Sequence, residues 1–178
     1  MIAKILIVLV VVLVIFIIVV VFQPSRYRIF RSTAISASPA DVFALINDLH
    51  RFQDWSPWAR LDPNMKLTYE GAPCGVGAAY AWEGNKKVGQ GRMTITESRA
   101  NELVRMKLEF IKPFPSTSMA EFVLKPEGAQ TAVTWSFSGD NNFMAKAFFL
   151  FVSMDKMVGG DFARGLAQLK NLTEKTKG

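Results

Sequence analysis

The chain opens with an apolar segment that differs from everything after it. Residues Ile5–Phe22 contain no charged or polar side chain. As a helix rising about 1.5 Å per residue, this segment is roughly 27 Å long, close to the hydrocarbon thickness of a bilayer. A helix of a small globular domain is rarely apolar on every face. The pattern predicts a transmembrane anchor in residues 1–24, ended by Pro24, which has no amide hydrogen to donate.

A cleaved secretory signal is the alternative for this segment. The run ends Val19-Val20-Val21-Phe22, without the small residues that a cleavage site needs, and it exceeds the usual 7–15 residues of a signal core. Both features favour an uncleaved, single-pass anchor. Lys4 precedes the segment and Arg26, Arg28 and Arg31 follow it, which favours a cytoplasmic domain. If these arginines belong to a first strand instead, the short basic N-terminus would place the domain outside.

The pattern changes after Pro24, and residues 25–178 have the size of one domain with a full core. An extended strand is predicted for residues 26–37. A helix is predicted for residues 40–49, because Ser38 is a good N-cap, Pro39 suits a first turn, and apolar residues share one face. A short helical turn is predicted in the aromatic segment that follows, residues 51–58.

From Asn64 to Ser138 the apolar period shortens from 3.6 to 2, which is typical of strands with one buried face. Short turn sequences separate the runs, so an antiparallel meander is predicted. Its six strands contain residues 65–69, 76–82, 93–95, 104–110, 120–124 and 133–137.

The last part of the chain returns to a helical period. Residues 143–175 are predicted to form a long helix that covers the apolar face of the sheet, with a break or kink at Gly159-Gly160. The predicted fold class is therefore α+β, with about seven antiparallel strands wrapped around a C-terminal helix.

Composition excludes several kinds of chemistry. The chain has one cysteine, Cys74, and one histidine, His50, which are too few and too isolated for a disulfide or a metal site. We expect no cofactor and no metal. The net charge of +6 is scattered, without a basic stripe between aromatic residues, so nucleic acid is not an expected partner. No nucleophile lies in a recognisable triad setting, and no catalytic residue is assigned.

The element order and several local sequences resemble the START-like helix-grip superfamily, also called SRPBCC, and within it the polyketide cyclase/dehydrase and lipid transport-like branch. Bacterial members of this branch often carry an N-terminal membrane helix, so the resemblance implies a single-pass protein of a bacterial inner membrane. The sequences that carry the resemblance are Ser38–Phe43, Asp54–Trp58, Trp82–Asn85, Val88–Gly91 and Gly160–Lys170.

The resemblance implies an apolar cavity between the sheet and the C-terminal helix. Inward positions of the strands and helix then give the candidate cavity residues, although the same side chains would also suit a solid core. These candidates are Tyr69, Tyr80, Trp82, Met93, Met106, Leu108, Phe110, Phe122, Trp135, Phe137, Phe162 and Leu166. Candidates for a gate or for membrane contact are Trp55, Trp58, Phe143, Phe148 and Phe151.

The leading hypothesis is a membrane-anchored domain that binds a hydrophobic small molecule or lipid, with membrane lipid as a partner. An aromatase/cyclase-like enzyme is the first alternative, because such a site can work by positioning without a triad. A partner-binding module without a ligand is the second. The first two hypotheses require that the C-terminal helix fill the concave side of the sheet only in part.

Overall fold

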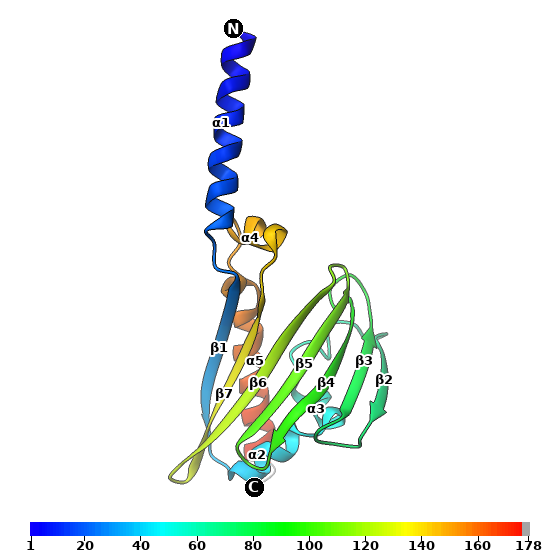
Figure 1. Ribbon diagram of the computed structural model, residues 1–178. Coiled ribbons are helices and arrows are strands. Elements are labelled where there is room, and N and C mark those ends of the chain that lie inside the picture. Colours follow the sequence, from blue (N-terminus) through cyan, green and yellow to red (C-terminus); the bar gives the residue numbers. More distant parts are fainter. Residues whose placement is uncertain (176–178) are drawn as a thin grey trace.

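The computed structural model describes residues 1–175 and shows a curved antiparallel sheet, a long C-terminal helix beside it and one isolated N-terminal helix (Figure 1). The predicted α+β class and the helix-grip arrangement are confirmed. The elements are α1 (Ile2–Val21), β1 (Arg26–Ile35), α2 (Pro39–Ile46), α3 (Leu49–Trp55), β2 (Lys66–Gly71), β3 (Ala78–Glu83), β4 (Gln90–Arg99), β5 (Leu103–Lys112), β6 (Ser116–Glu127), β7 (Gln130–Asp140), α4 (Phe143–Phe149) and α5 (Met154–Lys175).

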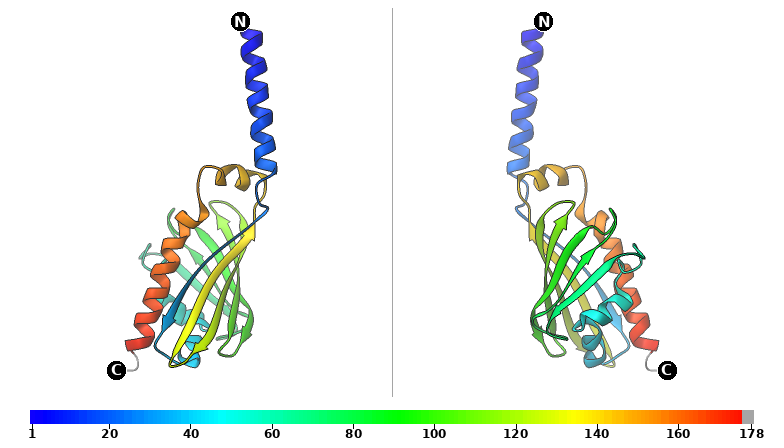
Figure 2. Two further views of the ribbon diagram at one scale, coloured as in Figure 1. Left: turned by 90° about the vertical axis from the view of Figure 1, so that its left-hand side faces the viewer. Right: turned by 90° about the vertical axis from the view of Figure 1, so that its right-hand side faces the viewer.

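The seven strands form one sheet in the order β1-β7-β6-β5-β4-β3-β2. Strands β2 to β7 pair with their neighbours along the chain, as a meander does, and β1 pairs with β7 through Arg26↔Asp140 to Ile35↔Thr131. All pairs are antiparallel, so the starts of β1, β2, β4 and β6 lie at the same end of the sheet as α1. We call this the membrane-side end, after the anchor that the sequence predicts for α1. Helix α2 closes the opposite end (Figures 1 and 2).

Alternation along the strands separates a core face from a charged outer face. On β5, Val104 and Met106 are buried, whereas Arg105 between them pairs with Glu97 and Glu121 on neighbouring strands. The sheet curves with its apolar side toward α5, whose residues Phe162, Leu166 and Leu169 are buried at helical spacing (Figure 2).

Two helices follow β1, as predicted, but their boundaries differ from the predicted ones. Helix α2 is capped by Ser38, whose Oγ accepts a hydrogen bond from the Asp41 backbone amide (3.3 Å), and it ends at Ile46 rather than at Leu49. The Asp48 carboxylate then accepts a bond from the His50 amide (2.9 Å) and caps α3. This N-cap explains the break, because Asp favours the start of a helix over its interior.

The predicted kink at Gly159-Gly160 is wrong. The C-terminal helical region is interrupted at residues 150–153 instead, and α5 runs through both glycines without a break. Close packing explains the glycine at position 165, where a Cβ would lie 2.8 Å from the ring of Trp135. At Gly159 a Cβ would meet the end of the flexible Arg31 side chain, Nη2, at 2.2 Å.

Helix α1 stands away from the sheet, and nearly all of its side chains are exposed (Figure 1). It is long and apolar enough to cross a membrane, a test that a signal sequence near an N-terminus also passes. Its end is joined to the domain by hydrogen bonds. Lys146 Nζ of α4 donates to the Val21 carbonyl (3.3 Å), and Asn141 Nδ2 donates to the Pro24 carbonyl (3.2 Å).

Candidate functional site

The middle of the interior is filled by a stack of aromatic rings. Trp135 of β7 lies between Phe162 of α5, with ring centroids 4.3 Å apart, and Phe122 of β6, at 4.9 Å. Trp55 and Trp58 meet the Trp135 ring edge-on at 5.8 and 5.7 Å. Offset and edge-to-face contacts of this kind stabilise a core beyond simple burial. The helix is therefore held to the sheet at this level by packed rings.

Trp55 and Trp58, two of the candidates for a gate or membrane contact, take part in this stack. Trp55 is fully buried, and its indole N–H donates to the Leu45 carbonyl (3.1 Å), which ties α3 to α2. Trp58 is half-buried. Neither side chain lies on the membrane-side surface in this conformation, and a gating role for them stays a prediction.

The twelve cavity candidates all belong to one apolar cluster or pack against it. Most are buried, whereas Tyr69, Leu108 and Phe110 keep part of their surface exposed. The buried candidates are Tyr80, Trp82, Met93, Met106, Phe122, Trp135, Phe137, Phe162 and Leu166. The structure thus brings the candidates together, but most of them contact one another in the core and do not line a cavity.

Packing is less complete toward the membrane-side end of the interior. Leu108 and Phe110 are partly buried there, and Phe110 meets Trp82 edge-on at 5.8 Å and Phe137 at 6.5 Å. Trp82 lies flat on Gly91 of β4, since a Cβ at Gly91 would lie 2.4 Å from the indole ring. The Trp82 indole N–H donates to the Val88 carbonyl (3.1 Å). These contacts bring three large apolar rings together toward this end of the interior, and Phe137 connects them to Tyr27, which contacts Phe149 of α4.

A hydroxyl pair beside these rings was missed by the sequence analysis. Tyr27 Oη and Ser118 Oγ lie 2.8 Å apart, and the tyrosine ring crosses over Gly139, where a Cβ would lie 2.5 Å from its hydroxyl oxygen. Burial raises the pKa of Tyr27, so its hydroxyl stays protonated at neutral pH. Ser118 lies on the same face of β6 as the buried Ala120 and Phe122. A polar residue at an inward position of the strand was the sign in the sequence that could have indicated this pair.

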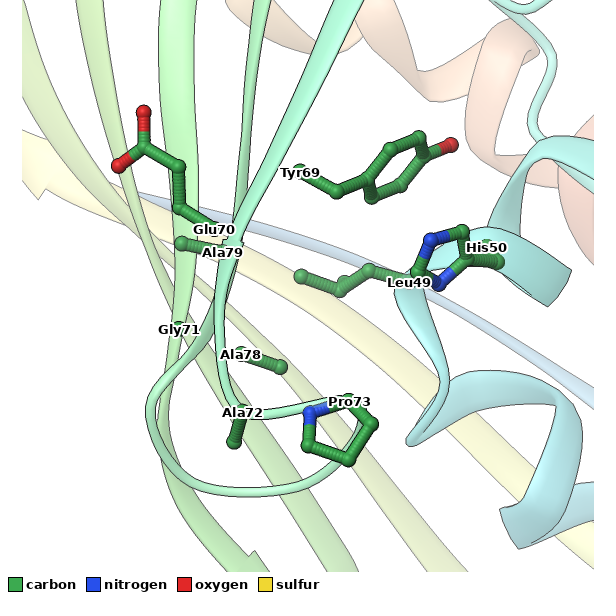
Figure 3. A pocket seen from close by; sticks show the side chains of 9 residues that line it. All are labelled: Leu49, His50, Tyr69, Glu70, Gly71, Ala72, Pro73, Ala78 and Ala79. Atoms are coloured by element: carbon green, nitrogen blue, oxygen red, sulfur yellow. The ribbon is translucent and has the colours of Figure 1, made fainter.

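Two cavities stand out in residues 1–175, and neither lies between the sheet and α5. One of about 200 Å³ lies near the end opposite α1 (Figure 3). His50 stacks on Tyr69 at its wall, with centroids 3.8 Å apart, whereas Glu70 points away on the other side of the strand (Figure 3). It is lined by Leu49, His50, Tyr69, Glu70, Gly71, Ala72, Pro73, Ala78 and Ala79.

Neither cavity suits a hydrophobic ligand. The cavity at His50 is smaller than the roughly 300–1,000 Å³ typical of drug-sized ligand sites. The second, of about 320 Å³, lies on the charged outer face of the sheet. It is lined by Arg28, Arg105, Met119, Glu121, Ser136 and Ser138. Within the described residues no group of three or more His, Cys, Asp or Glu side chains is placed to hold a metal ion.

The remaining membrane-contact candidates lie on the surface next to α1. Phe143 and Phe148 of α4 and Phe151 just after it are exposed, and no residue of α4 is buried. Tyr27 contacts this region from below, with its ring centroid 6.5 Å from that of Phe149. Helix α4 therefore lies over the membrane-side end without being built into the core.

Comparison with known families shows where this architecture belongs. Residues 27–174 match the family described as polyketide cyclase / dehydrase and lipid transport. The chain belongs to this family. The match spans the sheet and all helices after α1, so the family resemblance seen in the sequence is confirmed for the domain. Comparison with curated proteins gives no match.

Solved structures show the same fold at low sequence identity. The Aha1 dimer from Colwellia psychrerythraea is similar with a TM-score of 0.61 and 18% identity, over 85% of this chain and 99% of that one. Protein CV1439 from Chromobacterium violaceum gives 0.58 and 16% over the same shares. DynU16, a protein in the dynemicin biosynthetic locus, gives 0.56 and 12% over 85% of this chain and 48% of that one. These likenesses establish the fold.

Proposed function

We propose that this protein is a membrane-anchored domain that binds a hydrophobic small molecule or lipid between its sheet and α5. The observation that carries the proposal is the incompletely packed, aromatic membrane-side end of the interior, which lies next to an apolar helix of membrane-spanning length. The family, whose description includes lipid transport, supports this class of ligand.

The chemistry of this end suits an apolar guest with a polar group. Trp82, Phe110 and Phe137 supply flat apolar surface, which accounts for most of the affinity in small-molecule sites. The Tyr27–Ser118 pair supplies hydroxyls that donate and accept hydrogen bonds. A lipid or polyketide-like molecule with a hydroxyl or carbonyl oxygen at one end matches both features.

Entry requires a movement, because the rings contact one another in the structure. Helix α4 is the element best placed to move, since none of its residues is buried and it is joined to the helices and strands around it by surface contacts. Displacing it would uncover the region of Phe110 and Phe137 while the Trp135 stack stays in place. The binding site proposed here is therefore the part of the candidate set nearest α4, with Trp135 and Phe122 as core.

Photo-crosslinking tests this proposal on the full chain in vesicles. The probe is a fatty acid that carries a diazirine at the end of its acyl chain, and adducts are mapped by peptide mass spectrometry. We expect adducts on inward residues of β3, β5 and β7, and several-fold fewer when Phe110→Ser makes that wall polar. Phe30→Ser, on the outer face of the sheet, is the matched control and should leave the adducts unchanged. Adducts confined to α1 and α4 would overturn the proposal.

The alternatives predict different results with the same preparation. Turnover of a poly-β-ketone by the full chain would favour the cyclase-like enzyme, since the family description covers that activity as well. Absence of interior adducts together with absence of turnover would favour a partner-binding module.

A further inference from the structure

Exposed apolar side chains gather at the membrane-side end of the domain. Beyond α1 and Phe22, ten large hydrophobic side chains are exposed among the described residues. Three of them lie outside this end or before β2: Phe30 in β1, Leu61 in the loop before β2, and Val76 in the loop between β2 and β3. The other seven lie in the β5–β6 hairpin, in α4, between α4 and α5, or in the first turn of α5: Ile111, Phe114, Phe143, Met144, Phe148, Phe151 and Met157.

These seven residues form two separate groups. One group, on α4 and beside it, lies at the foot of α1 (Figure 1). The other is the tip of the β5–β6 hairpin, which lies at the same end in the middle of the sheet, since β6 pairs with β7. Phe114 at this tip is 80% exposed and stands between Pro113 and Pro115, whose fixed φ angles stiffen the turn. A phenyl ring held in water by a stiff turn adds nothing to the packing of the domain, which points to a contact outside it.

Positive charge accompanies the hairpin group. Lys86 and Lys87 in the β3–β4 turn and Lys112 beside Phe114 are exposed at the same end. Two carboxylates nearby are paired already, Asp140 with Arg26 (3.3 Å) and Asp155 with Arg31 (2.8 Å). Aromatic side chains between lysines are suited to the interface of an anionic bilayer, where rings enter the headgroup region and ammonium groups meet phosphates.

We infer that the β5–β6 hairpin is a second membrane contact, which together with α4 holds the open end of the sheet against an anionic bilayer surface. This inference rests on the proposed membrane anchor, α1. Because α1 and α4 hold the β1–β7 edge at the bilayer and Phe114 holds the middle of the sheet, the domain stands upright on the bilayer. The region of Phe110 and Phe137 then faces the lipid headgroups, and a lipid reaches it without crossing bulk water.

Lipid-dependent quenching on the full chain tests the inference. In a Cys74→Ser background, single cysteines introduced by Phe114→Cys and Phe151→Cys are labelled with an environment-sensitive fluorophore. The labelled chains are reconstituted into vesicles of equal parts phosphatidylcholine and phosphatidylglycerol, with a quencher on the lipid chains. We expect quenching at 114 and 151 several-fold stronger than at two control sites. These are Phe30→Cys in the same background, on the outer face of the sheet, and Cys74 of the unsubstituted chain, in the β2–β3 loop at the far end.

Charge reversal separates the two contacts. In the triple variant Lys86→Glu, Lys87→Glu, Lys112→Glu, we expect quenching at 114 to fall toward the control level, while 151, next to α1, stays quenched. In the chain that keeps its lysines, quenching at residue 114 that is no stronger than at residues 30 and 74 would overturn the inference. If the same chains resist alkaline extraction from the vesicles, the anchor still stands and only the second contact fails. Crosslinking of residue 114 to a protein instead of lipid would likewise overturn it.

Discussion

Trp135 is the residue on which packing between the sheet and α5 depends most. It is 2% exposed and touches rings from α5, β6 and the α3 region. Removing its side chain leaves a large cavity whose walls, being rings on different elements, cannot collapse together. We expect Trp135→Ala to lower the free energy of unfolding by about 3–5 kcal/mol. Denaturant unfolding of the full chain in detergent measures it, and Phe30→Ala should change it by less than about 0.5 kcal/mol.

The tyrosines give a pH dependence with a defined sign. Burial raises the pKa of all three, Tyr27, Tyr69 and Tyr80. Their neutral forms are favoured in the folded chain, so this contribution to stability is complete below the unfolded pKa of about 10 and is lost as pH rises through the folded values. We expect tyrosinate absorption to develop at higher pH in the folded chain than in the same chain in denaturant. Coincident titration curves would contradict this.

The alternation along each strand told which residues face inward, but not which of them belong to the site. Alternation places Trp135 and Phe110 in the same inward class, and both do face inward. Which of them is sealed in the core depends on sheet curvature and on where α4 lies, and these arise from contacts between distant segments. The sequence did not predict the Tyr27–Ser118 pair, because the two residues are far apart in the chain and come together only through strand pairing.

At the scale of elements, two of the three glycines in α5, Gly160 and Gly165, have very different surroundings. A Cβ at Gly160 would meet only Nη1 of Arg164, at 3.8 Å, whereas a Cβ at Gly165 would meet the Trp135 ring at 2.8 Å and Pro57 Cδ at 3.0 Å. Alanine is a better helix former than glycine, so Gly160→Ala should stabilise the domain by about 0.5–1 kcal/mol. Gly165→Ala should destabilise it by about 1–3 kcal/mol through overpacking. Thermal unfolding of the two variants side by side tests the contrast, and equal effects would refute it.

The strands were predicted well because each of β2 to β7 has one apolar face, so a period of two was visible in local sequence. Helix boundaries were predicted less well. The division between α2 and α3 depends on the Asp48 cap, and Gly159 lies inside α5, beside the side chain of Arg31 from β1. A glycine that permits close packing and one that breaks a helix look the same in sequence.

At the scale of the whole molecule, an uncleaved α1 makes a direct prediction about the mature protein. Intact mass spectrometry of the chain purified from membranes should show residues 1–22 present, and alkaline washing should leave the chain with the lipid. A washed-out chain that lacks these residues would identify α1 as a cleaved signal. Arg26, Arg28 and Arg31 all lie in β1, so the short basic N-terminus before α1 is left to set the orientation. A reporter fused after Lys175 should therefore be active on the non-cytoplasmic side, and activity in the cytoplasm would contradict this.

The connection between α1 and β1 consists of four residues, 22–25, and spans at most about 14 Å when fully extended. Hydrogen bonds from Asn141 to Pro24 and from Lys146 to Val21 also hold this connection against the domain. With α1 as the proposed anchor, so short a connection does not let the domain travel between two bilayers or across a compartment. A ligand of the proposed kind would then have to enter and leave at the surface of the bilayer that holds α1, and its acceptor would have to come to that surface.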